Sequence, residues 1–183
     1  MTDEILFDIR NHIGHITLNR PAAFNALTHS MIKIMHAKLL EWERDKNIYA
    51  VVMRGAGEKA FCAGGDIRAV YDSVTSGGDL HKNFFVDEYE FDFYMHKYRK
   101  PVVVLMDGVV MGGGVGLAMA AALRVVGDKT KFAMPETNIG FFPDVGATYF
   151  LSRLLGHLGE YLGITGAQLK AADCLYAGIS DVY

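Results

Sequence analysis

The sequence has little cysteine and little net charge, and each shortage excludes a class of protein. Only two cysteines occur, Cys62 and Cys174, and they are more than a hundred residues apart. This excludes a disulfide framework and favours a reducing compartment. The formal net charge is -3 and 51% of the 183 residues are hydrophobic. We therefore expect neither a disordered tail nor a nucleic-acid-binding surface.

Targeting and membrane-spanning patterns are also missing. Residues 1–10, MTDEILFDIR, are acidic and strand-like, unlike a signal peptide or an arginine-rich transit peptide. The longest apolar stretch, residues 102–126, is interrupted by Asp107, Arg124 and several glycines, so no membrane span is expected. These features predict a soluble cytoplasmic protein, or a mitochondrial matrix protein if a presequence has been removed. Its expected partners are small molecules or further copies of itself in a homo-oligomer, with no nucleic acid and no membrane.

Periodicity of the apolar residues predicts an α/β layered domain that spans residues 1–183. Residues 5–10 and 15–19 indicate a β-hairpin, and Thr28 is placed to cap a helix with one apolar stripe. Asp66 is placed to cap a helix from Ile67, and residues 73–79 are expected to form a mobile loop. The remaining expected elements are strands at 50–53, 102–106, 124–126 and 132–134, and helical segments at 84–98, 115–123 and 149–155.

Two glycine clusters stand where a chain enters a predicted helix. Gly112 to Gly114 separate a strand from a small-residue helix, and the first amides of a helix have no internal acceptor. Such amides suit a phosphate cradle or an oxyanion hole. The spacing fails the dinucleotide pattern, and no Gly-Lys-Ser/Thr follows for a P-loop. Gly64 and Gly65 offer a second set of free amides, although tight packing of a helix on a strand would also explain glycine at these positions.

Two acids, Glu136 and Asp144, each follow a proline and lie eight residues apart. Apolar neighbours are expected to make the charged form of Glu136 less stable. Asp144 is expected in the first turn of a helix, where the dipole would stabilise its anion. A capping role for Asp144 and an exposed turn position for Glu136 remain open, although two acids in different environments are typical of an attacking and a water-activating carboxylate.

Other reaction chemistries fit the sequence less well. The seven histidines are scattered without H-E-x-x-H, so no metal site is predicted. A serine-hydrolase triad lacks its G-x-S-x-G elbow. Cys62 lies beside the glycines, but a small buried cysteine is a better interpretation than a thiol nucleophile.

Several ordered motifs together resemble the crotonase (enoyl-CoA hydratase/isomerase) superfamily. They are Ala60 to Ile67, Gly108 to Gly116 and Phe132 to Gly140, with Asn19 to Pro21 and Asn25 to Leu27 in the amino-terminal part. The resemblance implies a spiral of strand-strand-helix units. It also implies an oxyanion hole for a thioester, made by the backbone amides of Gly65 and Gly113, with Gly64, Asp66 and Gly112 among the substrate-binding residues.

The acids narrow the resemblance within the superfamily. Its hydratases carry a glutamate at the position of Gly116 and a glycine at the position of Asp144, whereas Glu136 with Asp144 is similar to the 3-hydroxyisobutyryl-CoA hydrolase subgroup. This implies hydrolysis of a short branched β-hydroxyacyl-CoA, as in valine catabolism, with Glu136 as nucleophile or base. Asp144 would orient the water or the hydroxyl. Glu88 matches an acidic position near the substrate, although a solvated face of a charged helix would also explain it. Coenzyme A would enter as part of the substrate, with no separate cofactor.

Two alternatives stay open. The first is an enoyl-CoA hydratase or isomerase that uses Glu136 alone, and the second is a non-catalytic acyl-CoA-binding or assembly subunit. The subgroup's proteins continue beyond the position of Tyr183, with helices that cover the acyl pocket and support subunit contacts. We therefore expect this chain to lack that carboxy-terminal helical region.

Overall fold

Two sheets form the centre of the computed structural model, which describes residues 4–183. Residues 1–3 of the acidic, strand-like start lie outside the described residues. The larger sheet has the order β1-β2-β3-β5-β7, and the smaller sheet has the order β4-β6-β8. Only β1 and β2 are antiparallel; every other pair of neighbouring strands within residues 4–183 is parallel. The bounds of the strands are Ile5–Arg10 (β1), Ile13–Leu18 (β2), Ala50–Gly55 (β3), Ala60–Cys62 (β4), Val102–Met106 (β5), Val109–Met111 (β6), Leu123–Val126 (β7) and Lys131–Ala133 (β8).

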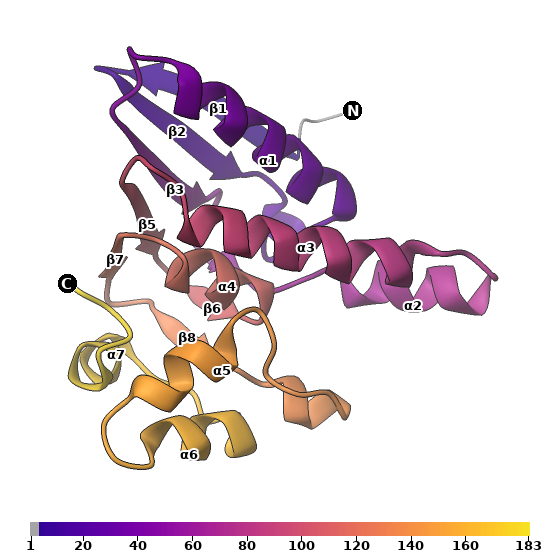
Figure 1. The fold of residues 1–183 in the computed structure, drawn as a ribbon. Helices are drawn as coiled ribbons and strands as arrows, with labels where there is room; N and C mark the ends of the chain where they lie inside the picture. The colour runs from indigo at the N-terminus through magenta and orange to yellow at the C-terminus, as the bar shows by residue number, and fades with distance from the viewer. Residues whose placement is uncertain (1–3) are drawn as a thin grey trace.

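The chain winds between the sheets as a spiral. The strand pairs β3 and β4, β5 and β6, and β7 and β8 each place their first strand in the larger sheet and their second in the smaller one. Helices follow the pairs: α1 (His29–Arg44) after β2, α2 (Ile67–Thr75) and α3 (Leu80–His96) after β4, and α4 (Gly113–Met119) after β6. Figure 1 shows α3 crossing the middle of the molecule between α1 and α4. The predicted α/β spiral of strand-strand-helix units is confirmed.

The first helix illustrates how local sequence forms these elements. The hydroxyl oxygen of Thr28 accepts a hydrogen bond from the Met31 N–H at 3.2 Å, as predicted for a helix cap. The buried side chains of the helix repeat at helical spacing and form one stripe, namely Met31, Ile32, Met35, Leu39 and Trp42. Asp66 likewise caps α2, because its carboxylate accepts from the Ala69 N–H at 3.2 Å. Both caps therefore agree with the sequence prediction.

Other boundaries differ from the prediction. The helix expected over residues 115–123 ends at Met119, because Leu123 pairs with Val103 in the larger sheet. The expected loop at residues 73–79 begins later, since α2 continues to Thr75. The helix expected at 149–155 is two short turns, α5 (Ala147–Phe150) and a 3-10 turn (Leu151–Arg153), followed by α6 (Leu158–Thr165) and α7 (Ala171–Ala177). Within the described part of the chain, no helix is both long and apolar enough to cross a membrane.

Candidate functional site

The two glycine clusters lie against each other at the ends of β4 and β6. Gly64 and Gly112 have φ angles of +108° and +48°, which L side chains rarely adopt. A Cβ placed on Gly64 would lie 3.5 Å from the Gly113 nitrogen, and one placed on Gly113 would lie 3.4 Å from the Gly65 nitrogen. Among the hydrogen bonds of residues 4–183, neither of these two amides has an acceptor. The structure therefore brings together two free N–H donors, the arrangement an oxyanion hole requires.

Glu136 reaches the glycines from the 3-10 turn Glu136–Ile139, which follows β8. The side chain is 7% exposed, and its Oε1 would lie 3.2 Å from a Cβ placed on Gly112. Its Oε2 has no hydrogen-bond partner in the described part of the chain. Burial raises the pKa of Glu136 to about 7, from an ordinary value of 4.5. The expectation that its surroundings disfavour the charged form is confirmed, and its exposed-turn alternative is wrong.

Glu88 approaches the same glycines from α3. A Cβ placed on Gly113 would collide with its Oε1, which has no hydrogen-bond partner within residues 4–183. The residue is 3% exposed, so burial is the main reason why its pKa rises to about 8, and the charge of Asp144 adds to the effect. Glu88 is thus a buried acid beside the predicted oxyanion hole. The alternative of a solvated helix face is wrong.

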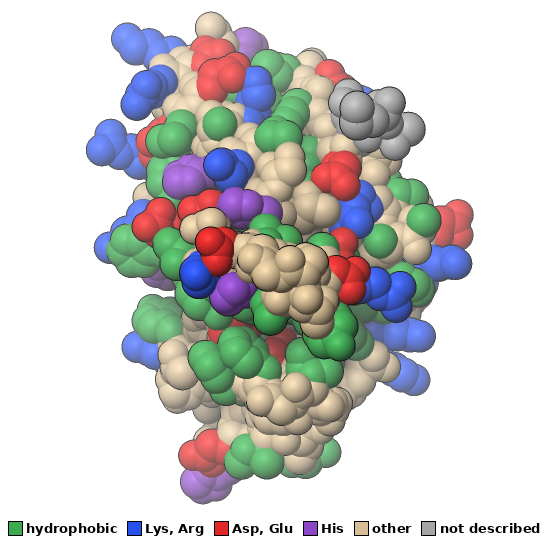
Figure 2. Space-filling view, turned by 90° about the vertical axis from the view of Figure 1, so that its right-hand side faces the viewer, with side chains coloured by type: hydrophobic (Ala, Val, Ile, Leu, Met, Phe, Trp, Pro, Cys, Tyr) green, Lys and Arg blue, Asp and Glu red, His purple; other side chains and the backbone are tan. Residues whose placement is uncertain are grey.

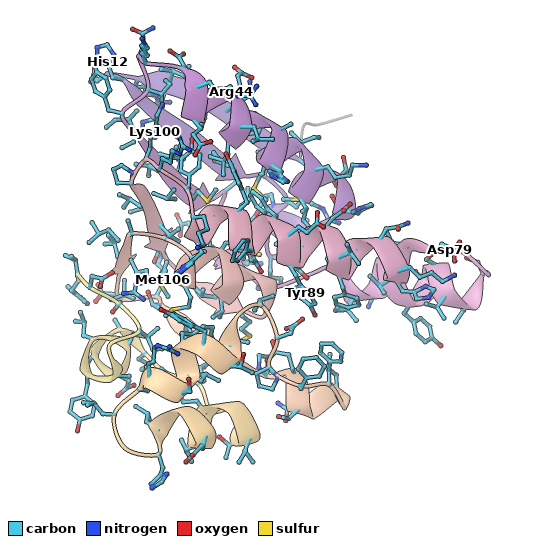
Figure 3. All side chains as sticks on the ribbon, viewed as in Figure 1. His12, Arg44, Asp79, Tyr89, Lys100 and Met106 are labelled. Carbon is cyan, nitrogen blue, oxygen red and sulfur yellow. The ribbon has the colours of Figure 1, made fainter. Side chains whose placement is uncertain are left out.

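Asp144 occupies a different setting from the one predicted. It is half-buried and lies three residues before α5 begins, so the helix dipole does not stabilise its anion. Burial instead raises its pKa, although a hydrogen bond from the Tyr89 hydroxyl at 2.5 Å lowers it. In Figure 3 Tyr89 projects from α3 toward the segment below it. The prediction of a stabilised anion in a first helical turn is therefore wrong, because the chain turns through Val145 and Gly146 before the helix starts.

One acid of the site, Asp92, was missed by the sequence analysis. It lies one helical turn after Glu88 on α3, is 9% exposed, and has no hydrogen-bond partner for either oxygen within residues 4–183. Burial raises its pKa well above the ordinary value, and the charges of Glu88 and Asp144 add to the shift. The four-residue spacing from Glu88 was the available signal, since such residues share a helix face. We call Glu88, Asp92, Glu136 and Asp144 the acid cluster.

A cavity of about 940 Å³ opens on one side of the acid cluster. Asp92, Asp144 and Gly116 belong to its lining, which continues over largely apolar side chains of α3, α5 and α7. Figure 2 shows acidic side chains deep in a recess bordered by hydrophobic ones on one face of the molecule. A space of this size, with a few polar groups in an apolar wall, suits a small organic group.

Asp66, a predicted substrate-binding residue, and Cys62, expected to be a buried core residue, both have structural roles. The carboxylate of Asp66 is shared between the Ala69 N–H and Arg20, whose Nη2 lies 2.9 Å away. Its predicted contact with substrate stays a prediction. Cys62 is fully buried and burial raises the pKa of its thiol to about 12, as expected for a small core residue. No group of three or more His, Cys, Asp or Glu that could hold a metal ion occurs within residues 4–183.

Several known proteins are similar to this chain in sequence. The family model for enoyl-CoA hydratase/isomerase matches residues 13–183. The mitochondrial 3-hydroxyisobutyryl-CoA hydrolase of Danio rerio is 49% identical over 177 residues, which are 97% of this chain and 46% of that protein. The small ribosomal subunit protein mS47 of Neurospora crassa is 46% identical over 184 residues, covering 99% of this chain and 36% of that protein. The cytoplasmic location and the homo-oligomer expected above stay predictions.

A solved structure extends the likeness to three dimensions. The crystal structure of a carnitinyl-CoA dehydratase from Mycobacterium thermoresistibile has a TM-score of 0.94 and 46% identity, covering 98% of this chain and 53% of that chain. The chain thus spans about half the length of this structure and less than half of the curated relatives. The resemblance drawn from the motifs is confirmed. The chain belongs to the enoyl-CoA hydratase/isomerase family and has its crotonase fold.

Proposed function

We propose that the chain hydrolyses the thioester of a short branched β-hydroxyacyl-CoA, such as 3-hydroxyisobutyryl-CoA. The observation that carries the proposal is the position of Glu136: its Oε2 has no hydrogen-bond partner within residues 4–183, and its carboxyl lies beside the glycines that present two free amides. The names of several relatives support the choice of substrate. The substrate would bring coenzyme A with it, and no separate cofactor is needed.

The two amides would act on the thioester carbonyl. The N–H groups of Gly65 and Gly113 would donate hydrogen bonds to the carbonyl oxygen as it gains negative charge, and losing one such donor typically costs about 3 to 4 kcal/mol of transition-state stabilisation. This part of the site would serve any reaction of an acyl-CoA that builds charge on that oxygen. It therefore supports the substrate class rather than the reaction type.

Glu136 could act in either of two ways. As a nucleophile, its carboxylate forms a bond to the carbonyl carbon, the carbon-sulfur bond breaks, and the departing CoA thiolate takes a proton from solvent; water then cleaves the mixed anhydride. As a base, it removes a proton from the water that attacks the same carbon. Single turnover in ¹⁸O-labelled water detects an anhydride that water opens at the glutamyl carbon, because the label then enters the carboxyl of Glu136. Label in the acid product alone fits the base route and also an anhydride opened at the acyl carbon.

Asp144 supports hydrolysis over hydration. Gly116 has no side chain where the hydratases are expected to carry a glutamate, so Glu136 has no second acid there to add water across a double bond. Asp144 is instead held by the Tyr89 hydroxyl at the edge of the cavity. From this position it could orient the attacking water or the hydroxyl of the substrate.

The test is release of free thiol from a panel of acyl-CoA thioesters. Glu136→Gln is expected to reduce kcat by about two to four orders of magnitude, and Asp144→Asn should reduce it less. Glu90→Gln and Asp72→Asn are matched controls, because both residues are exposed on α3 and α2. Unchanged rates in both site variants would sink the hydrolase assignment. Loss of enoyl absorbance with crotonyl-CoA would favour the hydratase alternative.

A second candidate is a structural subunit of a ribosome. The observation that favours it is the 46% identity to protein mS47 over 99% of this chain. Its support is weaker, because a structural role gives no reason for the buried acids Glu88 and Glu136 beside the two free amides. Within residues 4–183, each of these acids has one oxygen without a hydrogen-bond partner. Co-sedimentation of the chain with small ribosomal subunits, together with no turnover of any thioester, would select this candidate.

A further inference from the structure

Acids of α3 and glycines of α4 face each other in register. Glu88 and Asp92 are one turn apart on α3, and Gly113 and Gly116 are one turn apart on α4. Glu88 lies against Gly113, and the Oδ2 of Asp92 would lie 2.7 Å from a Cβ placed on Gly116. Each carboxyl therefore occupies space that the facing glycine leaves free. The first pair belongs to the site described above, but the second has no assigned role.

Asp92 belongs to the lining of the cavity and carries a buried, unsatisfied carboxyl group. Both of its oxygens lack a hydrogen-bond partner within residues 4–183, although the side chain is 9% exposed. Leaving such a group unpaired is unfavourable, because it loses its hydrogen bonds to water without gaining others. Of the residues beside it, Gly116 has no side chain and Val145 is apolar, and the hydroxyl of Tyr89, three residues earlier on α3, is donated to Asp144. A ligand in the cavity could supply the missing hydrogen bond.

We propose that Asp92 recognises a hydroxyl group on the acyl chain of the substrate, where Asp92 lines the cavity. A hydroxyl both donates and accepts a hydrogen bond, and a protonated carboxyl does the same. Burial, with the charges of Glu88 and Asp144, raises the pKa of Asp92 and so favours its protonated form. The inference rests on the proposed function for the substrate class, acyl-CoA, and adds the residue that selects among acyl groups.

Glycine at position 116 is a condition for this role. A Cβ there would lie 2.7 Å from both Asp92 Oδ2 and the Cβ of Val145, closer than real Cβ contacts. Any side chain at 116 would thus displace the carboxyl of Asp92 or move Val145. The glutamate expected at this position in hydratases is therefore incompatible with Asp92 as placed here. The carboxyl on this side of the site comes from α3 rather than from α4.

The test compares binding of two CoA thioethers, which cannot be hydrolysed. One carries a 3-hydroxyisobutyl group and the other an isobutyl group, and calorimetry gives the ratio of their Kd values. The 183-residue chain is expected to bind the hydroxylated compound about tenfold or more tightly. Asp92→Leu and Gly116→Ala should bring the ratio close to one. Asp92→Asn, which keeps a donor and an acceptor, should retain most of the preference, and Asp72→Asn should leave it unchanged.

The outcomes separate this inference from the proposed reaction. Three outcomes would overturn the role of Asp92. The unsubstituted chain could show no preference, the preference could survive Asp92→Leu, or neither compound could bind. A preference that depends on Asp92, in a chain that hydrolyses no thioester, would leave the recognition standing and overturn the hydrolase. Thermal unfolding of each variant shows whether it folds. Gly116→Ala gives an independent route to the same answer, because it acts on Asp92 without replacing it.

Discussion

Replacing Glu88 with glutamine should change how the stability of the chain depends on pH. Glu88 is 3% exposed, and its pKa is about 8 in the folded chain against an ordinary value of 4.5. The unfolded chain releases this proton near pH 4.5, whereas the folded chain holds it until about pH 8. Between these values the folded state binds more protons, so the free energy of unfolding falls as pH rises.

The size of the effect follows from the two pKa values. One pKa unit corresponds to about 1.4 kcal/mol, so the shift from 4.5 to about 8 is worth on the order of 5 kcal/mol. The stabilising contribution of the neutral acid is fully present below pH 4.5, is more than half lost by about pH 7, and is gone above about pH 8. Glutamine does not titrate. Glu88→Gln should therefore flatten the pH dependence by about 1.4 kcal/mol per pH unit over this window.

The measurement is urea unfolding at a series of pH values, followed by fluorescence. Trp42 is the only tryptophan and is 2% exposed, so its emission reports loss of the core. Glu90→Gln is the control, because Glu90 is exposed on the same helix. A shallower slope is expected for Glu88→Gln alone, with a residual slope from Asp92, which titrates in the same direction and is coupled to Glu88. Parallel curves for the unsubstituted chain and Glu88→Gln would refute the reasoning.

Three further predictions concern the site and the fold. The rate of thioester hydrolysis should rise through about pH 7 and then level off, because Glu136 acts after losing its proton; a thiol-release rate that is flat across this range would contradict its role. Gly113→Ala should reduce kcat by about two to three orders of magnitude, since a Cβ there collides with Glu88 and crowds the predicted oxyanion hole; unchanged turnover would argue against that hole. Thr28→Ala should lower the free energy of unfolding by about 1 kcal/mol through loss of the bond from the Met31 N–H, and a urea midpoint equal to that of the unsubstituted chain would exclude the cap as a source of stability.

The fold was more predictable from sequence than the site. Local signals were sufficient for the caps at Thr28 and Asp66, and the expected strand at residues 102–106 coincides with β5. Local signals failed where tertiary pairing decides. Leu123 carries a helical pattern but pairs with Val103, so the helix before it ends early.

The site required contacts between segments that are far apart in the chain. The motifs identified Glu136 and the glycines, but the setting of Asp144 was predicted wrongly because Tyr89, 55 residues away, and burial against the cavity determine it. Asp92 was missed for a related reason. The four-residue spacing places Asp92 on the same helix face as Glu88. No pattern within α3 shows that this residue lies against Gly116 of α4.

The position of each carboxyl, rather than their number, distinguishes the reactions that this fold could support. Two backbone amides beside Glu136 are compatible with hydration, isomerisation or hydrolysis of an acyl-CoA. An acid on α4 would face the substrate from one direction, but the α4 residue at that place is Gly116, and Asp92 fills the space from α3. The raised pKa of Asp92 favours its neutral form, which can hold a hydroxyl group but does not accept a proton as a base does. Glycine in place of an acid at position 116 would thus remove the second acid that hydration needs. It would also leave room for Asp92, which would select a hydroxylated acyl group.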